Sequence, residues 1–179
     1  MTDKELLVEY LNGNMNAFHT FYENYKDSLY TFLRNRSEEN ADDLFQETFV
    51  RFIDALLKKE INKPKSYLFQ IAMNLLRNRS RQAKIILLSP EYDVPDQETE
   101  EEDEFPIKEE ELKLSLLKLA KEKPEFYDVL HLHIFEKMTF DQISDLKQQN
   151  RNTISSRYRY AIHYLRKLLQ PGLELVKEV

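Results

Sequence analysis

Residues 42–57 read DDLFQETFVRFIDALL, and residues 64–81 read PKSYLFQIAMNLLRNRSR. Apolar residues recur in both stretches three and four positions apart, which is the period of an amphipathic helix. On a helical wheel, one face of the first stretch gathers Phe45, Phe49, Phe52, Ile53 and Leu56. Its opposite face carries Asp43, Glu47, Val50 and Asp54. This helix is therefore predicted to bury an aromatic stripe and to present an acidic surface that contains a valine.

The second stretch predicts a helix with a very different outer face. Its core side holds Leu68, Ile71, Ala72, Leu75 and Leu76, and another face gathers Tyr67, Gln70, Asn74, Arg77, Asn78 and Arg81. A helix face that only contacts water usually mixes acids with bases, but no acid interrupts this one. Arginines suit phosphates, amides suit base edges and an aromatic ring can stack on a base. The face favours nucleic acid, including unstacked bases, and a plain solvated surface is the alternative.

Apolar residues also recur at three and four positions in the rest of the chain, which predicts further helices on both sides of these two segments. We expect a short helix over Glu5–Leu11 that Gly13 ends, a second over about residues 17–34 with Asn16 as its cap, and four more helices after residue 107. β-branched residues do not alternate anywhere, so no strand is expected. The predicted fold is all-α, with two small helical domains at 1–85 and 108–179.

The charge distribution separates these domains. The net charge is -6, yet residues 64–84 contain five basic residues and no acid, whereas residues 85–107 contain nine acids and no base. Residues 86–107 also include Pro90, Pro95, Pro106 and the run Glu100–Glu104, which oppose compact structure. We therefore expect a flexible acidic linker there. The two basic segments, 64–84 and 147–167, suggest two separate contacts with a polyanion.

The composition excludes several classes of site. With only two glycines, the chain cannot form a Walker loop, a dinucleotide fingerprint or a nucleophile elbow, and with no cysteine it has no disulfide or zinc ribbon. We expect no enzymatic activity, cofactor or metal. His131 and His133 are two residues apart, so on a helix they point away from each other and do not form the i,i+4 pair of a helical metal site. His133 is expected in the core and His131 on the surface. No signal peptide or run of about 18 apolar residues is present, so a cytoplasmic location is expected.

The C-terminal segment contains a helix-turn-helix pattern. Thr139-Phe140-Asp141-Gln142 is a capping box that opens one helix, and Asn150 can cap the next after a turn near 148–150. The second of these helices is predicted to bury Ile154, Tyr158, Ala161 and Leu165. Its opposite, acid-free face carries Asn152, Ser155, Ser156, Arg159, His163 and Arg166, with Arg157 at the border for a backbone phosphate. The alternative is a helical hairpin that binds a protein partner.

Four motifs resemble those of the bacterial RNA polymerase sigma factors. Residues 42–51, DDLFQETFVR, resemble "EDLVQETFLR"; residues 64–81 resemble "P..WLYRIARNLAID..R"; residues 140–166 resemble "YEEIAEILGISVGTVKSRLHRARKALR". The early GNMNAF at 13–18 resembles "GD..AF". Their order and spacing are similar to those of the extracytoplasmic-function group, which keeps only sigma regions 2 and 4. The resemblance spans about residues 5–169 and implies a factor that brings core polymerase to promoters.

The resemblance implies a role for each surface. The first helix quoted would bind the clamp helices of the largest polymerase subunit through Asp43, Gln46, Glu47, Val50, Arg51 and Asp54. The loop 58–65 would capture a flipped promoter base, and the residues that would read and melt the minus-ten element are Lys63, Lys65, Tyr67, Gln70, Asn74, Arg77, Asn78 and Arg81. The last helix would read the minus-thirty-five element through Arg151, Asn152, Ser155, Ser156, Arg157, Arg159, His163 and Arg166. The implied partners are core polymerase, including the flap of its second-largest subunit, promoter DNA and an anti-sigma factor.

Three residues depart from the family pattern. The turn glycine is replaced by Gln148, the apolar residue after it by Gln149, and a lysine by Ser155. A glutamine enters the left-handed backbone region only with strain, so the turn could be rebuilt. Two alternatives therefore stay open: a helix-turn-helix regulator that acts without polymerase, and an interaction module that has lost DNA binding.

Overall fold

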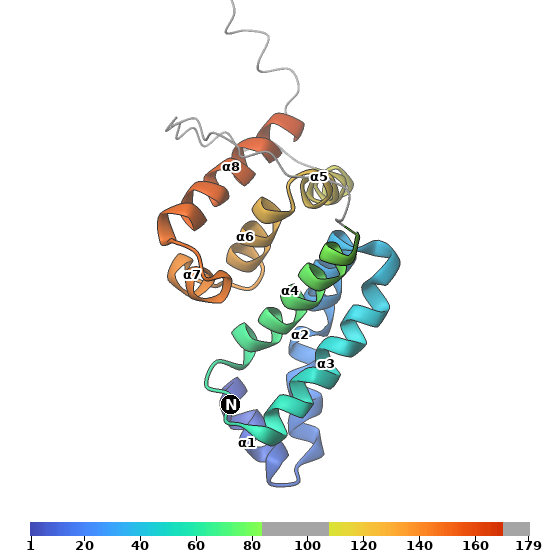
Figure 1. Ribbon diagram of the computed structural model, residues 1–179, viewed down its shortest axis with the longest axis vertical. Coiled ribbons are helices and arrows are strands. Elements are labelled where there is room, and N and C mark those ends of the chain that lie inside the picture. Colours follow the sequence, from blue (N-terminus) through green and yellow to red (C-terminus); the bar gives the residue numbers. More distant parts are fainter. Residues whose placement is uncertain (84–107, 170–179) are drawn as a thin grey trace, which may run out of the picture. The chain divides into compact units, whose positions relative to one another are not determined.

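The structure, a computed structural model, describes residues 1–83 and 108–169, and these residues contain helices and no strand (Figure 1). They form two compact units, one built from α1 to α4 and one built mainly from α5 to α8. The all-α prediction is therefore confirmed for this part of the chain. The predicted linker, 86–107, lies outside the described residues.

The first unit contains α1 (Asp3–Leu11), α2 (Met15–Arg36), the 3-10 turn η1 (Glu38–Asn40), α3 (Ala41–Lys58) and α4 (Pro64–Ala83). Each predicted helix is present and is slightly longer than predicted. Gly13, with a φ of 98°, separates α1 from α2 as expected. The cap of α2 was assigned wrongly, because Asn14, not Asn16, precedes its first residue, and its side chain makes no capping hydrogen bond.

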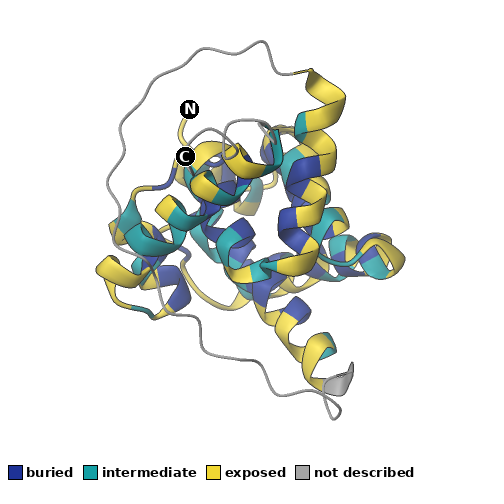
Figure 2. Cartoon of the chain, turned by 90° about the horizontal axis from the view of Figure 1, so that it is seen from above, coloured by how far each residue is buried: buried dark blue, intermediate teal, exposed yellow. Residues whose placement is uncertain are grey.

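Aromatic rings fill the core of the first unit, in which α2, α3 and α4 pack against one another. The rings of Phe21 and Phe52 stack with centroids 5.1 Å apart, and Phe32 meets Phe69 edge-on at 5.7 Å. The buried side of α3 is rotated from the predicted stripe. Leu44 is fully buried, whereas Phe45 is half-buried among other rings. Figure 2 shows the resulting division of the helices into buried and exposed faces.

The second unit contains α5 (Glu109–Glu122), α6 (Pro124–Ile134), α7 (Phe140–Lys147) and α8 (Arg151–Leu169). Pro124 occupies the first turn of α6, where its missing N–H costs nothing. The helices α5, α6 and α8 pack together, with Leu119, Tyr127, Leu132 and Ile154 almost completely buried. The predicted core positions of α8 are confirmed except for Tyr158, which is half-buried beside Phe140.

The two histidines of α6 have the opposite placement from the one expected. His131 is 1% exposed, its Nδ1 lies 3.2 Å from the Tyr127 hydroxyl, and its Nε2 lies 3.7 Å from a carboxylate oxygen of the buried Glu136. His133 is half-buried, with its ring on Phe140 and its Nδ1 2.7 Å from the carbonyl oxygen of Met138. The expectation was wrong because it assumed one buried and one solvent-facing side of α6, whereas the consecutive residues 127–132 are all buried.

Candidate nucleic-acid and protein interface

The outer face of α3 is exposed, as the sequence predicted. Asp43, Gln46, Val50, Arg51 and Asp54 are exposed, and Glu47 is half-buried. Val50 exposes 58% of its surface although it lies among charged neighbours. A single exposed apolar residue is common on protein surfaces, but Leu57, two turns further along the same face, is 65% exposed. The sequence prediction missed Leu57. Because Leu57 follows Val50 by seven residues, about two helical turns, the sequence already places both on the same face.

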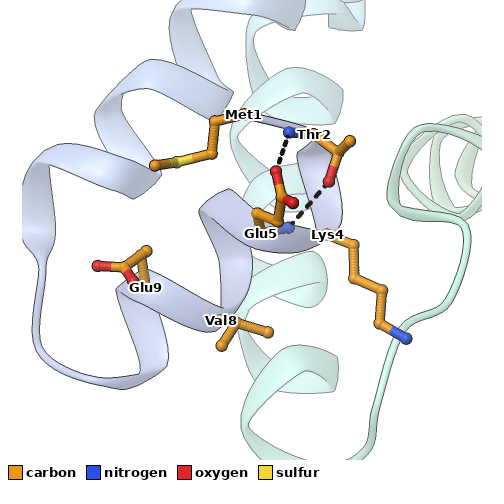
Figure 3. A pocket seen from close by; sticks show the side chains of 6 residues that line it. All are labelled: Met1, Thr2, Lys4, Glu5, Val8 and Glu9. Carbon is orange, nitrogen blue, oxygen red and sulfur yellow. Dashed lines mark hydrogen bonds between the residues drawn. The ribbon is translucent and has the colours of Figure 1, made fainter.

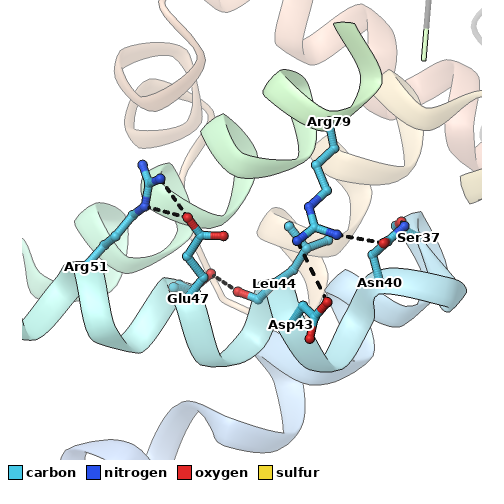
Figure 4. A network of polar contacts seen from close by, with 8 residues as sticks. Ser37, Asn40, Asp43, Leu44, Glu47, Arg51 and Arg79 are labelled. Atoms are coloured by element: carbon cyan, nitrogen blue, oxygen red, sulfur yellow. Dashed lines mark hydrogen bonds and ion pairs between the residues drawn. The ribbon is translucent and has the colours of Figure 1, made fainter. Parts of the chain in front are cut away.

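Two of the charges on α3 are paired within the unit (Figure 4). Arg51 donates from Nε and Nη2 to the same Oε1 of Glu47, at 3.0 and 2.6 Å. This is the i,i+4 arrangement in which an acid precedes a base, which is favourable on a helix. The surface offered by α3 therefore consists of exposed carboxylates, one internally balanced pair and two apolar side chains.

Arg79 of α4 contacts the N-terminal end of α3. Its Nη1 donates to Oδ1 of Asn40 at 2.6 Å, and its Nη2 lies 4.0 Å from a carboxylate oxygen of Asp43 (Figure 4). Asn40 in turn donates to the Ser37 hydroxyl at 3.2 Å. Nearby, the Tyr30 hydroxyl donates to Asp42 at 2.9 Å, and this bond raises the pKa of the Tyr30 phenol above its ordinary value. Arg79 thus connects the two helices, a role that the sequence prediction did not assign.

The acid-free face of α4 is available to a ligand. Asn74, Arg77, Asn78 and Arg81 are exposed, and among the described residues none of these four has a side-chain partner. They lie at spacings of three, one and three residues, so they share one side of the helix. Two arginines and two amides on one side, without a competing carboxylate, can bind phosphates and base edges.

The other predicted contacts of this unit lie at and before the start of α4. Tyr67 and Gln70 are half-buried, and the ammonium group of Lys59 lies 4.4 Å from the centre of the Tyr67 ring. Lys65 is half-buried with its ammonium group 5.5 Å from the Tyr25 ring, whereas Lys63 is exposed. One face of Tyr67 is therefore covered by a cation, a contact that the sequence did not predict.

The second unit forms the predicted helix-turn-helix. Thr139 and Gln142 exchange the two hydrogen bonds of a capping box, at 2.9 and 3.2 Å, at the start of α7. Asn150 caps α8 by accepting from the backbone N–H of Asn152 at 2.8 Å. Both capping predictions are confirmed.

The turn between α7 and α8 keeps the left-handed geometry despite its glutamines. Gln148 has a φ of 53°, and its backbone N–H bonds to the carbonyl oxygen of Asp145 at 3.3 Å. The backbone of Gln149 donates to Ser144 O at 3.1 Å and accepts from the Ser144 hydroxyl at 2.5 Å. These bonds hold a conformation that costs a non-glycine residue about 1–2 kcal/mol. The substitution that put the turn in doubt is therefore accommodated locally.

The predicted reading residues of α8 fall into two groups. Asn152, Arg159, His163 and Arg166 are exposed, and Ser155 and Ser156 are half-buried. The side chains of these six residues have no partner among the described residues. Arg151 is exposed but lies 3.0 Å from a carboxylate oxygen of Asp141. Arg157 donates to Gln149 at 2.5 Å and to Glu125 at 2.9 Å. Arg157 therefore braces the turn, in addition to any phosphate contact it makes.

Neither a metal site nor a membrane span is found in the described parts of the chain. No group of three histidine or acidic side chains is placed to hold an ion, and no described helix is long and apolar enough to cross a bilayer. A shallow hollow beside α1 is lined by Met1, Thr2, Lys4, Glu5, Val8 and Glu9 (Figure 3). Two of its polar side chains, Thr2 and Glu5, are already engaged in the capping box at the start of α1.

The first unit matches a known family in sequence. Residues 21–85 match the family model described as sigma-70 region 2. No protein of curated function matches the chain.

The fold matches solved structures over nearly the whole chain. One is CnrH in complex with the cytosolic domain of CnrY, at 19% identity and a TM-score of 0.63, covering 95% of this chain and 98% of that one. Another is the sigma factor RpoE of Bartonella quintana in complex with the anti-sigma factor NepR, at 19% identity and a TM-score of 0.62, covering 87% and 98%. The sequence motifs, the family match and the fold agree: residues 21–85 match sigma-70 region 2, and the fold of the chain is similar to that of CnrH and of the sigma factor RpoE.

Proposed function

We propose that this chain is a sigma factor that binds core RNA polymerase through α3 and directs initiation at specific promoters through α4 and α8. The observation that carries the proposal is the pairing of two unlike surfaces on adjacent helices. The exposed face of α3 is acidic and apolar, whereas that of α4 offers Asn74, Arg77, Asn78 and Arg81 with no partner among the described residues. A protein that only bound duplex DNA would need no surface like that of α3.

The geometry supports a division of labour between the units. The side chains of α4 suit single-stranded DNA of the minus-ten element, with amides for base edges and arginines for phosphates. The loop before α4 is basic and would hold a flipped base beside Tyr67. The face of α8 has the residue types that read a major groove, with Arg159 at its centre. No catalytic step is assigned to the chain, because phosphodiester chemistry would belong to the polymerase.

The solved structures of similar fold support a regulatory partner. CnrH is bound there to the cytosolic domain of CnrY, and RpoE is bound to the anti-sigma factor NepR. We propose that an anti-sigma factor likewise binds this chain in the cytoplasm. By covering the polymerase-binding surface, the DNA-binding surface or both, it would keep the factor inactive until a signal releases it.

The experiment is transcription in vitro with purified core polymerase on a genomic promoter library. Promoter-specific transcripts that depend on the full chain are expected. Alanine at both Asn74 and Asn78 should leave polymerase binding intact and reduce permanganate reactivity of unpaired thymines near the start site. Tight promoter binding without polymerase, and no transcripts with it, would instead identify a helix-turn-helix regulator. Normal reactivity of the double variant at normal occupancy would refute the role of α4.

A further inference from the structure

The first helix contacts the loop between α3 and α4, although it lies outside the region 21–85 that matches the family model. The loop comprises residues 59–63. The ammonium group of Lys4 lies 2.7 Å from a carboxylate oxygen of Glu60 and 3.0 Å from Oδ1 of Asn62. One side chain of α1 therefore contacts the loop at two points nearly 60 residues further along the chain. Figure 3 shows Lys4 extending from α1 toward this neighbouring segment.

The helix that carries Lys4 is itself firmly held. Thr2 and Glu5 form a complete capping box around it, with hydrogen bonds of 2.6 and 3.3 Å. The Tyr25 hydroxyl of α2 donates to Asp3 at 2.5 Å, and Leu6 and Leu7 are buried. The backbone at Lys4 is therefore held in place by α1, so the contacts of the Lys4 side chain restrict the loop more than they restrict α1.

The loop has few other attachments. Ile61 is buried and anchors its middle, and Lys59 leans over the Tyr67 ring. Glu60 and Asn62, which flank Ile61, are both exposed residues. The contacts with Lys4 therefore fix the two positions on either side of the single apolar anchor.

The pairing also removes a charge that would oppose DNA. Glu60 is the only acidic residue between residues 55 and 83, and all the other charged residues of that stretch are basic. Its hydrogen bond to Lys4 lowers the pKa of the Glu60 carboxyl below its ordinary value. Lys4 neutralises this carboxylate at short range, and the basic character of the loop is preserved.

We propose that Lys4 is a positioning residue for promoter opening: it holds the loop 59–63 in the shape that receives a flipped base and offsets the charge of Glu60. The inference rests on the proposed function, in which this loop captures a base. Lys4 need not touch DNA itself. Its effect is transmitted through Glu60 and Asn62.

The test uses the full chain bound to core polymerase on a forked promoter identified by the transcription assay. An abasic site is placed at each position of the exposed non-template strand in turn, and the affinity ratio between intact and abasic DNA is measured. With the unmodified protein, the position with the largest ratio marks the captured base. Lys4→Ala should lower that ratio by about 1.4- to fivefold, the range that an exposed ion pair spans, and Lys4→Arg should retain it.

The matched control is Lys26→Ala. Lys26 pairs with Glu23 at 2.8 Å on the surface of the same unit, a distance close to that of the Lys4–Glu60 pair. The control variant should keep the ratio, and both variants should keep the unfolding midpoint of the free protein. Asn62→Ala, which removes one contact of Lys4 without removing a charge, should reduce the ratio by a smaller factor.

Two outcomes would overturn the inference, and they differ in what else they affect. If the unmodified protein shows a clear abasic penalty and Lys4→Ala shows the same one, the positioning role of Lys4 is wrong while base capture stands. If no abasic position affects the unmodified protein, base capture itself fails, and the inference fails with it.

Discussion

The outer faces of α4 and α8 are both rich in polar and basic residues and free of acids, yet the structure uses them differently. On α4, the two exposed arginines and two asparagines have no partner among the described residues. On α8, Arg151 pairs with Asp141 of α7, and Arg157 bonds to Glu125 of α6 and to Gln149 of the turn. An acid-free face on one helix therefore does not guarantee unpaired arginines, because neighbouring helices can supply the carboxylates.

The comparison divides the arginines of α8 into those without a partner among the described residues, which we propose bind DNA, and those that hold the unit together. Arg159 has no partner among the described side chains and is exposed. Losing a base contact typically costs about 1–3 kcal/mol of binding free energy. Arg159→Glu should weaken binding to the upstream promoter element by more than this, because the new carboxylate also repels phosphates. Mobility-shift titration of the holoenzyme measures the effect. Core polymerase binding should survive, and wild-type promoter affinity would favour the interaction-module alternative.

Charge reversal on α3 tests whether that surface serves a protein rather than DNA. Glu47→Lys should weaken binding to core polymerase by about 1–3 kcal/mol, because it opposes a basic partner and also releases the Arg51 charge that Glu47 now balances. Fluorescence titration with labelled core enzyme provides the measurement. Glu38→Lys reverses another exposed acid outside α3 and should change little. Equal affinities for the Glu47 variant and the unmodified protein would show that α3 is not the polymerase surface.

Removing the bracing arginine tests the other half of the comparison. Arg157→Ala should lower the free energy of unfolding of the second unit by about 1–2 kcal/mol, since two hydrogen bonds to a charged group are lost. Arg159→Ala should leave stability unchanged. Thermal unfolding followed by circular dichroism distinguishes them. A large loss of DNA affinity for Arg157→Ala without any loss of stability would show that Arg157 is a phosphate contact, as the sequence alone predicted.

The smallest effect is expected at the turn that positions α8. Gln148→Gly should stabilise the second unit by about 0.5 kcal/mol, because relief of the positive φ outweighs the added freedom of glycine in the unfolded chain. Chemical denaturation measures this difference. Gly13, which already has a positive φ, offers the reverse test: Gly13→Ala should destabilise the protein by a similar or larger amount. Destabilisation by Gln148→Gly would mean that the glutamine side chain itself supports the turn.

The sequence by itself determined the helices and their exposed faces. The periodicity of residues 42–57 and 64–81 placed α3 and α4 within about two residues of their observed bounds, and the capping residues Thr139 and Asn150 were identified correctly. These features depend on neighbours three or four positions apart, so a single segment carries the information. The family resemblance, likewise carried by local motifs, was confirmed over residues 21–85 by the family match, and the fold agrees with it.

The tertiary structure decided which side chains pair with which. The contacts between Arg79 and Asn40, between Arg157 and Glu125, and between Lys4 and Glu60 join residues that are 32 to 56 positions apart. The burial of His131 likewise required the neighbouring elements, because packing covers α6 on several sides and periodicity alone assigns it a solvent face. Helical periodicity fixes which face a residue lies on, but only packing brings a specific charge from another helix close enough to pair with it.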